Sequence, residues 1–197
     1  MLVSGTTGWQ FFEWHRSVGE VTIALLLFRF LWGVVGSSNA RLSTFVSDPR
    51  LAIRHLIGLM KGHVAAERGH NAAGAWAVLV MLALVSFQAV SGLLIADEEE
   101  LIEGVFYGVL SSDQTDRLLY LHKQNATVLK LMIVLHVVMI AIYAARASTN
   151  LVKPMLTGSM TWPGAVALPN VVFQRRWIGL AIAIACALLV GTTLSWW

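Results

Sequence analysis

The chain has 197 residues, of which 57% are apolar and only 13% are charged, about half of the charged share of an ordinary soluble domain. This composition excludes a disordered chain, a secreted disulfide scaffold and an ordinary soluble enzyme, because a soluble fold of this size cannot bury so much apolar surface. The single Cys186 has no partner for an internal disulfide, and a net charge of +3 without clustered basic and stacking aromatic residues gives no sign of nucleic-acid binding.

Four long apolar runs follow one another along the chain, at about 17–36, 73–96, 124–145 and 177–197. Each is close to the length of about 20 residues that an α-helix needs to cross about 30 Å of hydrocarbon. Helices are expected rather than an open sheet, because the edges of a sheet would leave backbone groups unpaired in lipid. Tryptophans near the ends of the runs, such as Trp14, Trp76 and Trp177, are typical of membrane-interface anchors. The sequence therefore predicts an all-α integral membrane bundle of four transmembrane helices, with 1–197 as a single domain.

The segments that connect these runs differ in charge. Nine basic residues lie in 37–72 and 146–176, whereas three lie on the opposite side. An excess of Lys and Arg marks the cytoplasmic side, so we expect these two loops in the cytoplasm of a bacterial inner membrane. Both termini and the acidic loop 97–122 are then periplasmic. Two interpretations of the acidic loop remain open, a solvated surface and a docking patch for a basic redox partner.

Ionisable side chains inside the spans are costly to bury in lipid and are therefore candidates for function. His122 and His136 are fourteen residues apart, an interval that returns to within about 40° of the same helix face over about 21 Å of helix axis. One helix thus presents two imidazoles on one stripe, as two stacked haems require, since imidazole is a common axial ligand of haem iron. The alternative for His136 is an interhelical hydrogen bond. His55 and His63 lie in the basic loop and are expected to be solvated.

The first span repeats this interval with His15 and Arg29. Because the first and third spans run in the same direction, His15 is expected at the level of His122, where the two rings are predicted to clamp one haem; an interfacial residue is the alternative for His15. Arg29 is expected either to neutralise a haem propionate or to extend to the headgroups. Gly19, one turn after His15, leaves room for a flat macrocycle to approach the backbone. His70, at the start of the second span, fits a helix-start contact, a headgroup contact or a ligand of the inner haem.

At these residues the chain resembles the prokaryotic cytochrome b561 family, which includes the b-type subunit of nickel–iron hydrogenases. The matching pieces are HRSVG at 15–19, FRFLWGVVG at 28–36, ARLSTF at 40–45, GHNAAGAW at 69–76, QAVSGLLIAD at 88–97, LHKQNATVLKLMIVLH at 121–136 and NLVKPMLTG at 150–158. Each piece is degenerate alone, and their order together with the histidine interval carries the resemblance. It implies a helical bundle with two b haems, each held by two histidines. It also implies electron transfer between a periplasmic redox partner, such as a hydrogenase-like subunit or a c-type cytochrome, and membrane quinone.

Carried over by position, the resemblance implies His15 and His122 as ligands of the outer haem and His136 as one ligand of the inner haem. Family members usually begin with a further helix whose histidine is the second inner ligand, and we expect that helix to be missing from this sequence. The alternatives are then a ligand from His70 or from another chain, or a single haem.

The expected function is therefore that of an electron-transfer subunit of an oxidoreductase complex rather than a free-standing enzyme. Two alternatives remain open. One is a stand-alone membrane haem oxidoreductase that acts on a small species at the outer face. The other is a non-haem transporter or a membrane anchor, and spans without proline give little support to a transporter with broken helices.

Overall fold

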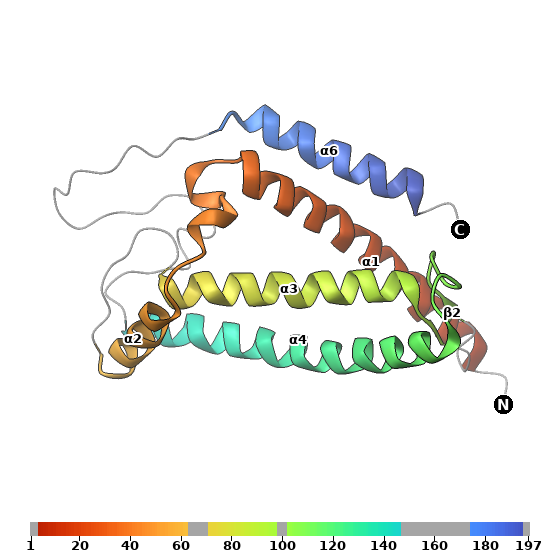
Figure 1. Cartoon of the computed structure of the whole chain (residues 1–197), viewed down its shortest axis with the longest axis horizontal. Helices are drawn as coiled ribbons and strands as arrows, with labels where there is room; N and C mark the ends of the chain where they lie inside the picture. The colour runs from red at the N-terminus through yellow and green to blue at the C-terminus, as the bar shows by residue number, and fades with distance from the viewer. Residues whose placement is uncertain (1–3, 63–70, 98–101, 147–173, 195–197) are drawn as a thin grey trace.

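Four long helices dominate the computed structural model, which describes residues 4–62, 71–97, 102–146 and 174–194 (Figure 1). They are α1 (Ser4–Val35), α3 (Ala72–Leu94), α4 (Ser112–Arg146) and α6 (Arg176–Thr193). Each contains a stretch that is long and apolar enough to cross a membrane. The predicted all-α bundle of four membrane-spanning helices is therefore confirmed.

Shorter elements lie between these helices. On one side of the bundle, two turns of 3₁₀-helix, η1 (Ser38–Ala40) and η2 (Leu42–Thr44), lead into the short helix α2 (Pro49–Met60). On the other side, β1 (Ala96–Asp97) and β2 (Ile102–Glu103) form a small antiparallel ladder with Ala96 opposite Glu103. The sequence analysis did not predict α2, because its apolar residues are too few and too interrupted to stand out as a span.

Helix α4 begins well before the apolar run that predicted it. Ser111 precedes the helix, and its backbone N–H donates to the side-chain oxygen of Gln114 at 3.1 Å, which is one half of a capping box. The first turns also hold an exposed ion pair four residues apart, Asp113 with Arg117 at 3.1 Å. These polar contacts extend the helix through 112–122, a segment that the sequence analysis assigned to the acidic loop.

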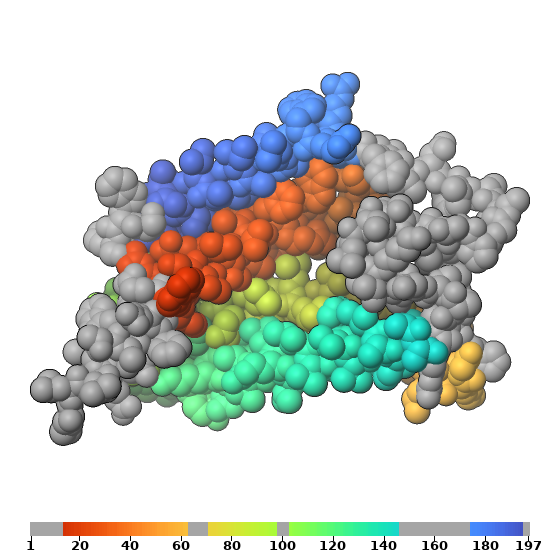
Figure 2. Space-filling model, turned by 180° about the vertical axis from the view of Figure 1, so that it is seen from behind, coloured from red at the N-terminus to blue at the C-terminus, as the bar shows by residue number. Residues whose placement is uncertain are grey.

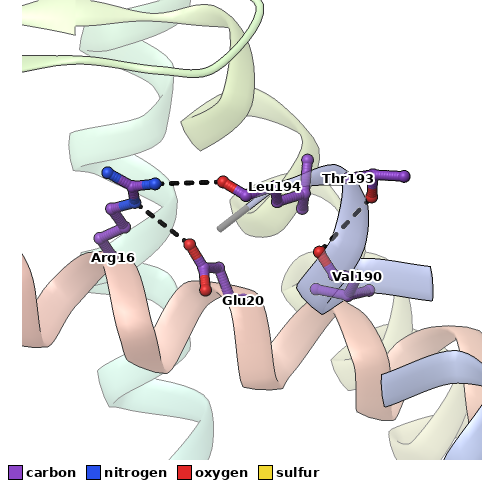
Figure 3. Close-up of polar contacts among 5 residues, drawn as sticks. All are labelled: Arg16, Glu20, Val190, Thr193 and Leu194. Atoms are coloured by element: carbon purple, nitrogen blue, oxygen red, sulfur yellow. Dashed lines mark hydrogen bonds and ion pairs between the residues drawn. The ribbon is translucent and has the colours of Figure 1, made fainter. Parts of the chain in front are cut away.

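The helices pack as two pairs that α1 connects. Helices α3 and α4 lie side by side and antiparallel, α6 lies along α1, and α1 also contacts α3 (Figure 1). Gly179 lets α6 approach α1 closely, since a Cβ there would lie 3.3 Å from the Trp32 ring. At the other end of this pair, the Arg16 guanidinium donates to the Leu194 carbonyl at 3.1 Å and pairs with Glu20 at 3.1 Å (Figure 3). Arg16 thereby satisfies a carbonyl that the end of α6 leaves without a helical partner.

Few side chains of the described residues are buried within the chain. Many large apolar side chains of the spans, such as Leu25, Leu131 and Leu188, are exposed. Such a surface is consistent with lipid as the surroundings of the helices. The few buried polar side chains, which include Ser91, His122 and Asn125, are therefore the informative ones.

Candidate functional site

The structure brings His15 of α1 and His122 of α4 together at one end of the bundle. Their ring centroids are 6.3 Å apart and their ring planes are inclined by 75°. Two imidazoles that bind one metal ion from opposite sides, with metal–nitrogen bonds of about 2.0–2.1 Å, have centroids about 6.4 Å apart. The observed separation therefore fits two imidazoles that would hold one haem iron.

The His122 ring is buried, and side chains of α3 contact both of its nitrogens. Ser91 Oγ lies 2.8 Å from Nδ1, and Gln88 Nε2 lies 2.7 Å from Nε2. The Ser91 hydroxyl donates its proton to the Phe87 carbonyl at 2.7 Å, so it accepts a hydrogen bond from His122. This network assigns the ring proton to Nδ1 and leaves Nε2 as the nitrogen with the lone pair, which the Gln88 amide now contacts.

The hydrogen bonds continue from His122 to a third polar residue. Asn125 Nδ2 donates to the Gln88 amide oxygen at 2.6 Å and to the Leu84 carbonyl at 3.0 Å. The sequence analysis missed Gln88, Ser91 and Asn125, although a signal was present. All three are polar residues inside apolar runs, and Asn125 lies three residues after His122, which places both on one side of α4.

Two glycines leave space around this pair of rings. A Cβ on Gly92 would lie 3.3 Å from His122 Cε1, so the absent side chain lets the ring lie against α3. A Cβ on Gly19, one turn after His15, would meet no atom within 4 Å. His15 itself is exposed. Seen from behind the view of Figure 1, α3 is recessed between α1 and α4, the two helices that carry the histidines (Figure 2).

The other predicted site residues do not join this cluster. His136 is exposed on α4 and contacts no second imidazole among the residues that the structure describes. The Arg29 guanidinium donates to the Ala40 carbonyl at 3.0 Å and lies 5.3 Å from the centre of the Phe45 ring. It is therefore held by the segment that follows α1, and its predicted contact with a propionate stays a prediction. His70 lies outside the described residues.

A second polar cluster lies at the opposite end of α4. The Tyr143 hydroxyl contacts His55 Nε2 of α2 and accepts from Asn71 Nδ2 at 3.0 Å, and the rings of His55 and Tyr143 are nearly parallel, at 16°. His55 is half-buried here, so the expectation of a solvated side chain was wrong. The cluster joins α2 to the ends of α3 and α4.

The chain matches a known protein family over most of its length. The family model described as prokaryotic cytochrome b561 matches residues 2–158, well over half of the chain. Neither a curated protein nor a solved structure matches it significantly. The chain belongs to the prokaryotic cytochrome b561 family, and it is a membrane haem b protein of electron transport.

Proposed function

We propose that this member of the prokaryotic cytochrome b561 family binds a b haem between His15 and His122 and links a periplasmic redox partner to membrane quinone. The observation that carries the proposal is the 6.3 Å separation of the two rings, with His122 held from α3 through both of its nitrogens. A bound b haem supplies one-electron chemistry at its iron. The protein supplies the ligands, their orientation and the surroundings that set the potential.

Ser91 has the role of an orienting residue in this site. By accepting a hydrogen bond from Nδ1 of His122, it fixes the tautomer and the rotation of the ring. Nε2 is then the nitrogen that would hold the iron, in place of its hydrogen bond to the Gln88 amide. Gln88 keeps a partner in Asn125, so its side chain need not be left without a hydrogen bond in lipid.

The place of the pair supports exchange with a partner on the outer side. His122 lies next to Lys123, whose ammonium pairs with Asp97 of β1 at 2.8 Å, and Glu103 of β2 is exposed nearby in the same ladder. Under the predicted topology this end of the bundle faces the periplasm, and its acidic residues favour a basic redox partner. A protein such as a c-type cytochrome or a hydrogenase-like subunit fits this description.

A second haem is proposed at His136, about 21 Å along the α4 axis from His122. Its second ligand would be His70 or a histidine of another chain. With neither ligand, the protein holds one haem only. The number of haems bound per chain decides between these arrangements.

The ligand assignment is tested by substituting each histidine in protein purified from haem-replete cells. His15→Ala and His122→Ala should each abolish or strongly weaken the Soret band of the outer haem. His55→Ala, at the other end of α4, is the control and should keep it. An unchanged spectrum in both ligand variants would overturn the assignment, and a colourless wild-type protein would favour a transporter or an anchor.

The space beside His15 is tested by a pair of glycine substitutions. A Cβ added at Gly19 meets no atom within 4 Å, and the same holds at Gly191 of α6, so the two positions form a matched pair. If a macrocycle lies beside α1, Gly19→Leu should lower the haem content while Gly191→Leu leaves it unchanged. Equal haem content in the two variants would show that the macrocycle lies elsewhere.

Electron exchange with quinone is tested in proteoliposomes. A lipid-soluble quinol added to the oxidised protein should reduce the haem, as followed by the shift of its visible bands. His122→Ala, which disturbs the ligation, serves as the control. A haem that is bound in wild-type protein but is not reduced by any quinol would exclude the quinone link without affecting the ligand assignment.

A further inference from the structure

Helix α2 is too short to be a span and differs from the other helices in how its residues are distributed. Its 12 residues reach about 18 Å, against about 30 Å of hydrocarbon. It starts as an independent helix does, with the Asp48 carboxylate accepting from the Arg50 N–H at 2.8 Å and with Pro49 at the first position.

Three kinds of residue occupy three separate faces of α2. Ala52, His55 and Leu59, within about 60° of one another, form the face toward the protein, where Leu59 is 4% exposed. An apolar face of about 100° follows it around the helix, and its side chains are exposed among the residues that the structure describes. It consists of Ile53, Leu56, Ile57 and Met60, of which Ile53 is 58% and Met60 79% exposed. Arg50, Arg54 and Lys61 lie beyond it, within about 40° of one another.

The contacts of the protein-facing side fix the level of α2 relative to the membrane. His55 contacts Tyr143, which lies three residues before the end of α4, and Asn71 is the residue that caps the start of α3. Ser47, just before α2, accepts a hydrogen bond through its carbonyl from the Trp76 indole at 3.1 Å. Helix α2 therefore lies where two spanning helices reach the membrane surface, at the depth where tryptophan side chains gather (Figure 1).

We infer that α2 is an interfacial helix whose apolar face enters the acyl boundary and whose basic face binds the headgroups of anionic phospholipids. An apolar face with a basic face beside it is the arrangement by which helices lie in a bilayer surface. The described neighbouring acid, Asp48, is occupied by the helix N-terminus, so it does not neutralise the basic face. Anionic phosphate at the headgroup level is the complement of three clustered cations.

The depth of the helix is tested with an environment-sensitive fluorophore on single cysteines in a Cys186→Ala background, in nanodiscs of zwitterionic lipid with and without an anionic phosphatidylglycerol. A label at Met60→Cys should be quenched by nitroxide-bearing lipid and protected from aqueous iodide. A label at Arg54→Cys, on the basic face about 120° around the helix from Met60, should be open to iodide. Equal iodide quenching at both positions would overturn the inference. Protection at Met60 without quenching by lipid would also overturn it, because a protein would then cover the face.

The role of the basic face is tested by varying the share of anionic lipid in the nanodiscs. The quantity measured is the fraction of anionic lipid at which the fluorescence of the label at Met60→Cys reaches half of its maximal change. Arg50→Gln together with Arg54→Gln should weaken headgroup binding by about 25-fold and raise that fraction accordingly, since each surface cation contributes about fivefold in binding. Arg175→Gln together with Arg176→Gln, which removes two exposed cations at the start of α6, should leave it within about twofold. If the two double variants shifted the fraction equally, anionic lipid would be attracted to any exposed basic residues, and a headgroup site on α2 would be excluded.

Discussion

Ser86 and Ser91 lie on the same helix, α3, and each hydroxyl donates a hydrogen bond at 2.7 Å to the carbonyl four residues earlier, that of Leu82 and of Phe87 respectively. Ser91 differs in one respect, because its oxygen also lies 2.8 Å from Nδ1 of His122. The two serines therefore separate the effect of a hydroxyl in α3 from the effect of a hydroxyl that orients a ligand.

Ser91→Ala is expected to lower the affinity for haem by about 10- to 100-fold, the usual consequence of removing a partner that orients a metal-ligating histidine. The same variant should shift the reduction potential of the haem that remains bound, because the hydrogen bond at Nδ1 changes the basicity of the ring. Ser91→Thr should retain both properties. Titration of the protein with haem and a redox titration of the Soret band measure them.

Ser86→Ala is the matched control and should leave affinity and potential at their wild-type values. If Ser86→Ala and Ser91→Ala had equal effects, the hydroxyl of Ser91 would act on the helix and not on the ligand. If neither had an effect, the hydroxyl of Ser91 would have no part in orienting His122.

At the residue scale, the sequence indicated the histidines but not the groups that hold them. His15, His122 and His136 stood out because an imidazole in an apolar run is costly and because an interval of fourteen residues preserves the helix face. Ser91 and Gln88 lie on another helix, and their contact with His122 depends on the relative rotation and height of α3 and α4. The relative rotation and height of two helices cannot be predicted from a single sequence.

At the scale of elements, the polar network also joins two helices. Asn125 of α4 donates to Gln88 and to the Leu84 carbonyl, both on α3. In lipid there is no hydrophobic force between apolar helices, so packing and hydrogen bonds between them gain weight. The network thus serves the α3–α4 pair as well as the ligand.

Asn125→Leu, which keeps the branching of the side chain and removes both hydrogen bonds, is expected to lower the free energy of unfolding by about 1–2 kcal/mol, since interhelical hydrogen bonds in membranes contribute about 0.6 and at most about 1.7 kcal/mol each. Equilibrium unfolding in mixed micelles measures the loss. Thr127→Val, two residues later, removes only a bond at 3.4 Å to the Lys123 carbonyl of the same helix and should be neutral. A loss of stability in Thr127→Val equal to that in Asn125→Leu would show that α4 tolerates no polar-to-apolar change, whatever its partners.

Hydropathy predicts the four spans but not the start of α4 or the helix α2. Long apolar runs predicted the four spans, because lipid demands length and low charge. The start of α4 depends instead on the contact of Ser111 with Gln114, and α2 depends on Asp48 and on a moderate apolar face. The start of α4 and the helix α2 are determined by local hydrogen bonds and by the change of surroundings from lipid to the membrane surface. A hydropathy average over a window of residues detects neither of these two causes.

At the scale of the whole molecule, the two ends of the bundle differ in charge as well as in chemistry. The end with His15 and His122 carries the ladder of β1 and β2 with Asp97 and Glu103, whereas the end with His55 and Tyr143 carries α2 and its basic face. The direction of electron flow across the membrane depends on which end faces the periplasm. The excess of basic residues in 37–72 and 146–176 predicts that α2 is cytoplasmic.

This orientation is tested by labelling single cysteines in intact cells with a maleimide that does not cross the inner membrane, again in a Cys186→Ala background. Ser43 of η2 and Ser111, just before α4, are both exposed and lie at opposite ends of the bundle. Ser111→Cys should react in intact cells, and Ser43→Cys should react only after the membrane is opened, because the nine basic residues predict that its side faces the cytoplasm. The reverse pattern would place the His15–His122 pair on the cytoplasmic side. The proposed partner would then have to be a cytoplasmic redox protein, while the ligand assignment, which depends on the 6.3 Å separation of the rings, would stand.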